Sequence, residues 1–259
     1  MRFRDKVVLL TGAGGGIGTA AAGKFVSEGA KVALFDVDQN AVRRLAADLG
    51  PAATYYVCDV SDETSFVGAI AASLRELGRI DLGVLNAGIS GKRQALQDID
   101  VAAFDTLMGV NVRGVFLGLK HLFPIMRDQG GGSIVVTSST EGLRGNGGLA
   151  PYVASKHAVI GLARTAALEW AAHNIRVNCI NPAPVDTPML RSIEKGLMDA
   201  GVTDVRERYT SRIPMQRYAT PEEVANFIAF LASDEASFST GGTYLVDGGV
   251  MAGVQAVKN

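Results

Sequence analysis

The feature that most constrains this chain is a glycine-rich turn between an apolar strand and a helix near the start of the sequence. Residues 7–10 read Val-Val-Leu-Leu and run into Thr-Gly-Ala-Gly-Gly-Gly-Ile-Gly at residues 11–18, which an alanine-rich helical stretch follows. Glycines let the backbone approach a pyrophosphate, whose charge is met by the N–H groups of the following helix. The spacing of Gly12, Gly16 and Gly18 is not the usual G-x-G-x-x-G motif. Strand, glycine turn and helix in this order nevertheless predict a dinucleotide phosphate site.

Short apolar runs alternate with helical patterns along the whole sequence. This alternation predicts an α/β fold, a doubly wound parallel sheet flanked by helices of the Rossmann type. A capping-box pattern with proline at the first helical position begins at Thr220 and predicts a late helix through Leu231. No linker divides the chain, so we expect a single domain over residues 1–259. The predicted strands cover residues 7–10, 31–35, 54–58, 82–85, 133–137, 176–180 and 243–246.

Charge and cysteine content narrow the classes of partner. The sequence has 25 Lys and Arg against 26 Asp and Glu, without a dense basic run, so we expect a small-molecule partner rather than nucleic acid or a membrane. Cys58 and Cys179 lie in apolar runs without metal-ligand spacing, which predicts reduced buried thiols and no metal site. The first strand follows Met1 closely and the apolar runs look too short to span a membrane, so we expect a cytoplasmic protein.

Three side chains in the second half of the sequence could form one proton-transfer site. Tyr152 and Lys156 are four residues apart in a helical pattern, so they share one helix face. A neighbouring ammonium favours the phenolate and is expected to move the tyrosine pKa from ~10 toward neutrality. Ser139 follows a predicted strand at its carboxyl end, where open α/β sheets bind their ligands. This set predicts an oxidoreductase with Tyr152 as its acid/base.

The second predicted strand ends in an acidic residue, Asp36. An acid at this position can bind the ribose hydroxyls of NAD and repel the extra phosphate of NADP. The neighbours that could instead pair with that phosphate, Gly15 and Val37, are not basic. The sequence therefore predicts NAD as the cofactor.

With these motifs in order, the chain resembles the short-chain dehydrogenase/reductase family over nearly its whole length. The family pattern T-G-x-x-x-G-I-G, N-A-G, Ser and Y-x-x-x-K appears at residues 11–18, 86–88, 139 and 152–156. The resemblance implies hydride transfer between a nicotinamide cofactor and a secondary alcohol or ketone. One position departs from the family, since Ala183 follows Pro182 where glycine is usual. We therefore expect a differently shaped loop beside the nicotinamide.

The resemblance also implies roles for individual residues. Tyr152 would move the alcohol proton, Ser139 would hydrogen-bond the substrate oxygen, and Lys156 would hold the nicotinamide ribose. Asn111, in an Asn-Val-Arg-Gly segment, would anchor a water between Lys156 and solvent, although an asparagine in an apolar helix could instead only mend a kink. Asp59 and Val60 would flank the adenine, and Thr187 would contact the carboxamide. The expected cofactor-binding residues are Gly12, Gly16, Ile17, Gly18, Asp36, Asp59, Val60, Asn86, Gly88, Tyr152, Lys156, Pro182, Val185 and Thr187.

A segment at about residues 188–212 is expected to form a lid over the substrate, as in the family. It carries an apolar stripe that could line the pocket or simply pack on its own domain, and it favours an apolar alcohol or ketone. The stripe consists of Met189, Leu190, Ile193 and Leu197. In the loop between Ser139 and Tyr152, Glu141 and Arg144 could read a polar substrate group or pair with each other.

Two alternative functions compete with this interpretation. Residues 145–148, Gly-Asn-Gly-Gly, resemble the corresponding loop of 3-oxoacyl carrier-protein reductases, which usually use NADPH, whereas Asp36 favours NAD. From a different class, the protein could be a sensor that binds NAD without turnover. The intact Ser139, Tyr152 and Lys156 set argues against a sensor.

The helix that carries Tyr152 and Lys156 is dense in small residues, which permit close helix approach. Its outward residues would leave an extended apolar surface of the kind that marks an interface. The resemblance implies contacts through this helix and a predicted helix over residues 105–129, with residues 243–246 near a second contact. We expect a homotetramer, with a dimer as the second choice. The other possibility is that alanine is present only for helix propensity.

Overall fold

Seven parallel strands form one sheet in the computed structural model, which describes residues 1–253. The strand order is β3-β2-β1-β4-β5-β6-β7, and every neighbouring pair is parallel. All seven predicted strands are present, and the doubly wound fold is confirmed. The strands are β1 (Val7–Thr11), β2 (Lys31–Asp36), β3 (Ala53–Val57), β4 (Leu82–Leu85), β5 (Gly132–Thr137), β6 (Ile175–Pro182) and β7 (Thr243–Val246).

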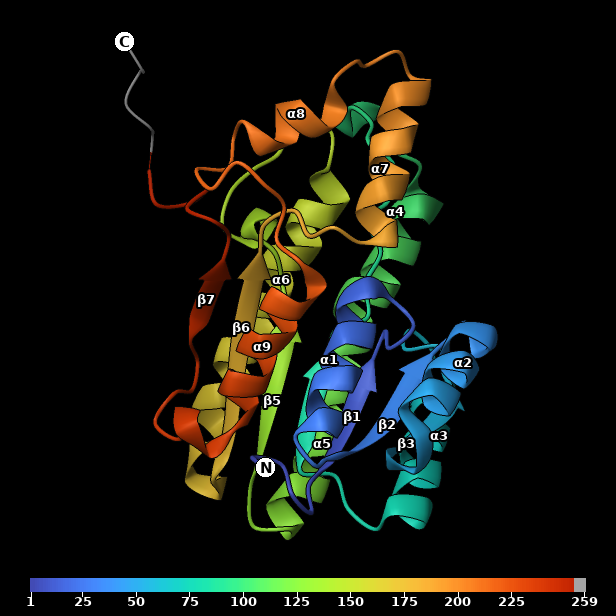
Figure 1. Ribbon diagram of the computed structural model, residues 1–259, viewed down its shortest axis with the longest axis vertical. Coiled ribbons are helices and arrows are strands. Elements are labelled where there is room, and N and C mark those ends of the chain that lie inside the picture. The colour runs from blue at the N-terminus through green and yellow to red at the C-terminus, as the bar shows by residue number, and fades with distance from the viewer. Residues whose placement is uncertain (254–259) are drawn as a thin grey trace.

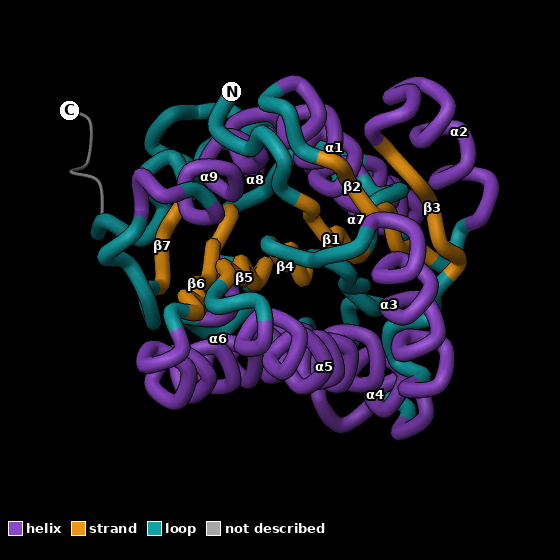
Figure 2. Tube along the Cα trace, turned by 90° about the horizontal axis from the view of Figure 1, so that it is seen from below, coloured by secondary structure: helices purple, strands orange, loops and turns teal. Residues whose placement is uncertain are grey.

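Helices cover both faces of the sheet, as Figures 1 and 2 show. One face carries α1 (Gly16–Ser27), α2 (Gln39–Leu49) and α9 (Pro221–Ala232). The opposite layer contains α3 (Glu63–Leu77), α4 (Val101–Met108), α5 (Gly114–Asp128) and α6 (Ala150–Trp170). Two further helices, α7 (Pro188–Asp199) and α8 (Val205–Thr210), lie beyond the carboxyl ends of the strands. Short helical turns span Gly50–Ala52, Leu96–Asp98, Gly109–Arg113, Thr140–Gly142, Ala171–His173 and Asp234–Ala236.

The central strands are apolar on both sides, which is why the sequence shows continuous apolar runs rather than strict alternation. Along β1, Val8 and Leu10 pack into the core beneath α1 and α9, whereas Leu9 packs into the core on the opposite face. Phe25 of α1 belongs to the first core and Phe66 of α3 to the second, and both are fully buried. Each face is therefore closed by its own apolar core, and the free ends of the strands are left to bind ligands.

The late helix α9 begins as the capping box predicts. The Thr220 hydroxyl accepts a hydrogen bond from the Glu223 backbone N–H at 3.3 Å, and the Glu223 carboxylate accepts one from the Thr220 N–H at 2.8 Å. These reciprocal contacts satisfy two N–H groups that the first turn would leave free. The predicted start of this helix is therefore confirmed.

The helix predicted over residues 105–129 consists of two helices joined by a wide turn. Helix α4 begins earlier, at Val101, where the Asp100 carboxylate accepts a hydrogen bond from the Ala102 N–H at 3.4 Å. Residues 109–113 then form a π-helical turn that contains the buried Asn111, and α5 continues from Gly114. Turns of this kind are frequent at functional sites.

We expected that no apolar run is long enough to cross a membrane. This expectation is wrong, because one helical stretch has the length and the composition of a membrane span. The helical stretch Val101–Asp128 is long and apolar enough to do so, and a third of its most apolar window is buried. Within this stretch Val115, Leu117 and Leu122 belong to the core beneath the sheet. A core helix of a globular domain and a membrane span both meet this criterion.

Candidate active site

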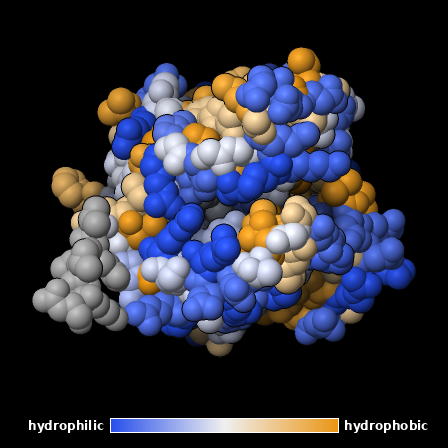
Figure 3. Space-filling view, turned by 90° about the horizontal axis from the view of Figure 1, so that it is seen from above, coloured by the Kyte–Doolittle hydropathy of each residue, from blue (hydrophilic) through white to orange (hydrophobic). Residues whose placement is uncertain are grey.

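A cavity of about 1200 Å³ opens at the carboxyl ends of the strands, between the glycine turn, the loops after β4, β5 and β6, and helix α7. Figure 3 looks onto this end of the molecule, where hydrophilic and hydrophobic residues both border the opening. Of the predicted site residues, only Gly18 and Asn111 do not line the cavity. The predicted residues that line it are Gly12, Gly16, Ile17, Asp36, Asp59, Val60, Asn86, Gly88, Ser139, Tyr152, Lys156, Pro182, Val185 and Thr187.

The glycine turn packs so closely against its neighbours that side chains at Gly12 and Gly16 would collide with them. Gly12 has φ +65°, and a Cβ there would lie 2.8 Å from the Ala87 Cα. A Cβ on Gly16 would lie 2.7 Å from Cγ2 of Thr187. Helix α1 starts at Gly16, and its N-cap, Gly15, makes no side-chain capping bond. The first N–H groups of α1 therefore have no side-chain competitor for an anion, and the turn fits a dinucleotide pyrophosphate.

Gly18 supports this turn. It does not line the cavity, and a Cβ built on it would overlap the carbonyl oxygen of Gly12. The structure gives Gly18 a packing role, and its contact with the cofactor stays a prediction. Glycine at position 18 allows α1 to approach the turn closely.

Asp36 lies at the end of β2 with both carboxylate oxygens engaged by backbone N–H groups. One oxygen accepts a hydrogen bond from Gly14 at 2.9 Å, and the other from Asp38 at 3.0 Å. The first contact joins the acid directly to the glycine turn. Asp36 is thus oriented at the wall of the cavity beside the largely exposed Val37.

A hydrogen-bond network joins the ends of three neighbouring strands. The Thr11 hydroxyl oxygen accepts from the backbone N–H groups of Asn86 and Ala87, at 3.0 and 3.1 Å. The Asn86 amide donates to the Gly12 carbonyl oxygen at 3.3 Å and accepts from the Thr137 hydroxyl at 3.2 Å. Asn86 therefore holds the glycine turn against β4 and β5 at the point where the strand order reverses.

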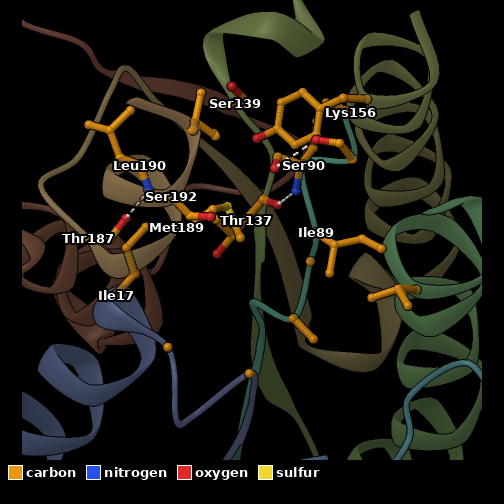
Figure 4. A pocket seen from close by; sticks show the side chains of 18 of the residues that line it. Ile17, Ile89, Ser90, Thr137, Ser139, Lys156, Thr187, Met189, Leu190 and Ser192 are labelled. Carbon is orange, nitrogen blue, oxygen red and sulfur yellow. Dashed lines mark hydrogen bonds between the residues drawn. The ribbon is translucent and has the colours of Figure 1, made fainter. Parts of the chain in front are cut away.

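Ser139, Tyr152 and Lys156 are brought together on one wall of the cavity. Lys156 is 4% exposed, and its ammonium lies 5.6 Å from the centroid of the Tyr152 ring. The ammonium also donates a hydrogen bond to the Thr137 carbonyl oxygen at 2.9 Å, which Figure 4 shows as a dashed line. The Ser139 hydroxyl oxygen accepts from the Glu141 N–H at 3.1 Å. The predicted proton-transfer set therefore exists as a spatial cluster.

The pKa of Tyr152 moves in the opposite direction from the one expected. Burial raises the pKa of this phenol, a hydrogen bond to Ser139 lowers it, and the charge of Glu141 raises it further. Burial also lowers the pKa of the Lys156 ammonium to about 8. In the protein alone, desolvation of the phenol outweighs the favourable hydrogen bond to Ser139. The expectation of a lowered tyrosine pKa is therefore wrong for the protein without ligands.

Asn111 joins the segment after β4 to helix α6. Its amide nitrogen donates to the Ile89 carbonyl oxygen at 2.9 Å and contacts the Ser155 hydroxyl at 3.0 Å, and its carbonyl oxygen accepts from the Ile89 N–H at 2.8 Å. A Cβ on Gly88 would lie 3.3 Å from Oδ1 of Asn111 and 3.4 Å from Nζ of Lys156. Asn111 thus lies behind the cavity wall. Gly88 packs closely against both Asn111 and Lys156, and a side chain at position 88 would crowd them.

Helix α7 lies over the cavity and forms its outer wall, as the labelled Met189, Leu190 and Ser192 show in Figure 4. Leu190 also packs in a small core with Ile213 and Tyr218. The Tyr218 hydroxyl donates to the buried Glu194 carboxylate at 2.7 Å. The apolar stripe of α7 therefore both lines the cavity and packs on its own domain. The stripe residues that line the cavity are Met189, Leu190, Ile193 and Leu197.

Glu141 and Arg144 pair with each other. The guanidinium of Arg144 lies 3.1 Å from one carboxylate oxygen of Glu141. The second oxygen of Glu141 is buried and has no hydrogen-bond partner among residues 1–253. Glu141 also lines the cavity, whereas Arg144 does not.

Ala183, at the position where the family usually has glycine, is buried and lines the cavity. Its backbone N–H donates to the Val246 carbonyl oxygen at 3.1 Å, so the loop after β6 starts in register with β7. The methyl group is accommodated without a positive φ at this position.

Sequence reasoning missed Asn181, which holds Ser139 in place. Asn181 is fully buried at the end of β6, and its amide donates to the Ser139 carbonyl oxygen at 2.7 Å. The backbone carbonyl of Thr137 was also missed as the acceptor for Lys156. A polar residue inside a predicted buried strand is a usable signal for Asn181, because buried amides need partners.

Both cysteines are buried free thiols, and burial raises the pKa of each to about 12. Cys58 lines the cavity near Asp59. Within residues 1–253, no cluster of three or more His, Cys, Asp or Glu side chains has the arrangement of a metal site.

Comparisons with known proteins agree with this geometry. A family model described as Enoyl-(Acyl carrier protein) reductase matches residues 12–251. Levodione reductase of Leifsonia aquatica is 40% identical over 255 residues, covering 96% of this chain and 95% of that protein. The crystal structure of levodione reductase superposes with a TM-score of 0.94 at 39% identity, covering 98% of this chain and 100% of the other.

Two further solved structures carry a nicotinamide cofactor. NAD⁺-bound xylitol dehydrogenase gives a TM-score of 0.92 at 35% identity, covering 96% of this chain and 100% of that one. A 3-ketoacyl-(acyl-carrier-protein) reductase from Brucella melitensis complexed with NADH gives a TM-score of 0.89 at 35% identity, covering 96% and 99% of the two chains.

Proposed function

The chain belongs to the short-chain dehydrogenase/reductase family, and from this premise we propose that it catalyses the NAD-dependent interconversion of a secondary alcohol and a ketone. It is an oxidoreductase that acts on CH–OH groups with a nicotinamide cofactor. The observation that carries the proposal is the position of Ser139, Tyr152 and Lys156 on one wall of a cavity whose floor is the glycine turn.

Residues of this chain fit each part of the cofactor. The turn from Gly12 to Gly16 and the start of α1 would hold the pyrophosphate, and Asp36 would bind the adenosine ribose. Lys156 would hold the nicotinamide ribose, and Thr187 would contact the carboxamide. When bound, the nicotinamide accepts hydride in oxidation and supplies it in reduction.

Tyr152 is proposed to exchange the proton at the substrate oxygen. In oxidation it takes the hydroxyl proton while the carbon loses hydride, and in reduction it returns a proton to the carbonyl oxygen. The Ser139 hydroxyl is proposed to hydrogen-bond the same oxygen, and its position is set by Asn181 and the Glu141 backbone. The raised pKa of Tyr152 favours the neutral phenol, which is the form that donates a proton to a ketone.

Asp36 supports NAD as the preferred cofactor. Its carboxylate is held at the cavity wall by two backbone N–H groups, so it cannot easily turn away from a ligand phosphate. A fixed negative charge there would repel the additional phosphate of NADP, whereas it would accept hydrogen bonds from the ribose hydroxyls of NAD. Gly15 and Val37 offer no compensating positive charge.

The test of this function is an absorbance screen for reduced cofactor with a panel of secondary alcohols and ketones, run with NAD and with NADP. The proposal expects turnover of at least one alcohol–ketone pair with a preference for NAD. Binding of NADH without turnover of any member of a broad panel would instead support the sensor alternative.

A 3-oxoacyl carrier-protein reductase stays the second candidate, because of the glycine-rich loop at residues 145–148 and the Brucella relative. Since that relative was crystallised with NADH, cofactor preference does not separate the two functions. An acetoacetyl thioester in the substrate panel does. A thioester turned over much faster than every simple ketone would favour the reductase.

We also propose a homotetramer, with a dimer as the second choice, working in the cytoplasm, where its cysteines would stay reduced. Exposed apolar side chains on α5 and α6 support the assembly, with Phe116 47% exposed and Leu168 85% exposed. The edge strand β7 carries Leu245 at 42% exposure, and Phe238 nearby in the sequence is fully exposed. Burial of these exposed apolar side chains between subunits is what the proposed assembly would supply.

A further inference from the structure

Two buried hydrogen-bond acceptors beside Ser139 lack a donor. Among the side chains of residues 1–253, only Oε2 of Glu141 and Oδ1 of Asn181 are buried polar atoms without a partner. Both residues are bonded to Ser139, the first through its backbone N–H at 3.1 Å and the second through its amide at 2.7 Å. Two unmatched acceptors therefore flank the residue proposed to bind the substrate oxygen.

Glu141 is the one of these two residues that lines the cavity. Its side chain is 12% exposed, and the Arg144 guanidinium holds the other carboxylate oxygen at 3.1 Å. Arg144 already compensates the negative charge of Glu141. What Oε2 lacks is therefore a hydrogen-bond donor, and a neutral hydroxyl would be sufficient. Leaving such an oxygen unpaired is unfavourable, and a ligand hydroxyl that reaches it would remove that cost.

The position of Glu141 determines how far such a hydroxyl lies from the reacting carbon. Glu141 follows Ser139 by two residues in the turn Thr140–Gly142, and its own N–H is bonded to the Ser139 hydroxyl. The charge of Glu141 also acts on Tyr152. A substrate whose oxygen contacts Ser139 and Tyr152 would place its neighbouring carbon in the part of the cavity that Glu141 also lines.

We propose that Glu141 is a specificity-determining residue whose carboxylate accepts a hydrogen bond from a second hydroxyl of the substrate. The substrate class is then vicinal diols and the corresponding hydroxyketones. This inference rests on the proposed alcohol–ketone function and refines the expectation of an apolar secondary alcohol or ketone. The apolar side chains of α7 would cover the carbon skeleton, while the Glu141 carboxylate would accept a hydrogen bond from the second hydroxyl.

The experiment compares kcat/KM for cyclohexanol and for its vicinal diol, in the wild type and in Glu141→Leu. We expect the wild type to prefer the diol by about 10-fold to 100-fold, the range of one hydrogen bond to a charged group. Glu141→Leu should bring the ratio close to one. Glu141→Gln retains a carbonyl acceptor and should restore part of the preference. Glu222→Leu, which removes an exposed acid on α9, is the matched control and should keep the wild-type ratio.

Replacing Arg144 tests whether its guanidinium compensates the negative charge of the Glu141 carboxylate. Arg144→Met would leave the Glu141 carboxylate uncompensated, so the vicinal amino alcohol should gain at least several-fold over the diol relative to the wild type. A wild type that treats diol and mono-alcohol alike, or a Glu141→Leu variant that keeps the diol preference, would overturn the proposal. The orphaned oxygen would then be satisfied by a buried water.

Binding separates failure of this inference from failure of the proposed function. Calorimetry of diol and mono-alcohol with the NADH-bound wild type and Glu141→Leu reports the same preference without turnover. If no alcohol is oxidised but the wild type still binds the diol more tightly and the variant does not, the hydride-transfer function fails and the Glu141 contact stands. Equal binding of both ligands to the wild type would overturn the Glu141 contact itself.

Discussion

The ammonium of Lys156 donates a hydrogen bond to the backbone carbonyl oxygen of Thr137 at 2.9 Å, and this contact ties helix α6 to the carboxyl end of β5. The hydrogen bond orients the lysine, but it supplies no opposite charge. Lys156 is therefore a buried cation without a carboxylate partner among residues 1–253, and burial lowers its pKa to about 8. A group of this kind is kept at the expense of stability.

We predict that Lys156→Met makes the cofactor-free protein more stable at pH 7 by about 1 to 3 kcal/mol. The unfolded lysine has the higher pKa, so the unfolded state binds more protons between about pH 8 and 10.5, the ordinary pKa of a lysine. Wild-type stability should therefore rise with pH across that window, and the variant should lack this rise. Denaturant unfolding at a series of pH values measures both effects. A less stable variant with an unchanged pH slope would contradict the prediction. The same variant should bind NADH more weakly.

Tyr152→Phe is predicted to keep the fold and NADH binding while turnover falls by roughly 100-fold to 10,000-fold. Only the hydroxyl that exchanges the proton is removed. Steady-state kinetics on the substrate found in the screen measures the loss, and fluorescence titration measures cofactor binding. Tyr244→Phe, which removes a hydroxyl on β7, is the matched control. Near wild-type turnover of the Tyr152→Phe variant would refute the acid/base role.

The wild type is predicted to bind NADH more tightly than NADPH, and Asp36→Ala to reduce that preference by about 10-fold or more. The carboxylate both accepts hydrogen bonds from the ribose and repels an added phosphate. Titration of each cofactor gives the ratio of dissociation constants. The control is Asp38→Ala, because Asp38 caps α2 and does not line the cavity. A wild type without cofactor preference would show that Asp36 does not select NAD.

Two glycines of helix α1 should respond oppositely to alanine. Gly18→Ala places a methyl group against the Gly12 carbonyl oxygen and should destabilise the protein by about 1 to 3 kcal/mol or more. Gly23 has no atom within 4 Å of a built Cβ, so Gly23→Ala should stabilise the protein by about 1 kcal/mol. Thermal unfolding of the two variants at equal protein concentration tests the pair. Equal effects would mean that the close approach at Gly18 is absent in solution.

Light scattering at micromolar concentration should give a mass of four chains, or two, rather than the single-chain mass of 27.1 kDa. Leu168→Asp places a charge on the exposed surface of α6 and should lower the mass. Val57→Asp is the control, because Val57 is an exposed apolar residue on the edge strand β3. A monodisperse single-chain mass for the wild type would exclude the proposed assembly.

The sequence by itself determined the features that depend on local pattern. The seven strands are visible because parallel strands buried on both faces must be continuously apolar, and the start of α9 is visible because a capping box is a four-residue signal. The glycine turn and the pair Tyr152 and Lys156 are local as well, since one turn of helix sets their relation. Nearly all predicted site residues therefore line one cavity.

The tertiary structure alone decided what depends on burial and on partners distant in the sequence. Spacing could not show that desolvation would raise the Tyr152 pKa, that Gly18 would pack against the turn, or that Asn181 would hold Ser139 from another strand. It also could not show that Arg144 pairs with only one oxygen of Glu141. Hydrogen-bond satisfaction and desolvation depend on every group packed around an atom, and those groups come together only when the chain has folded.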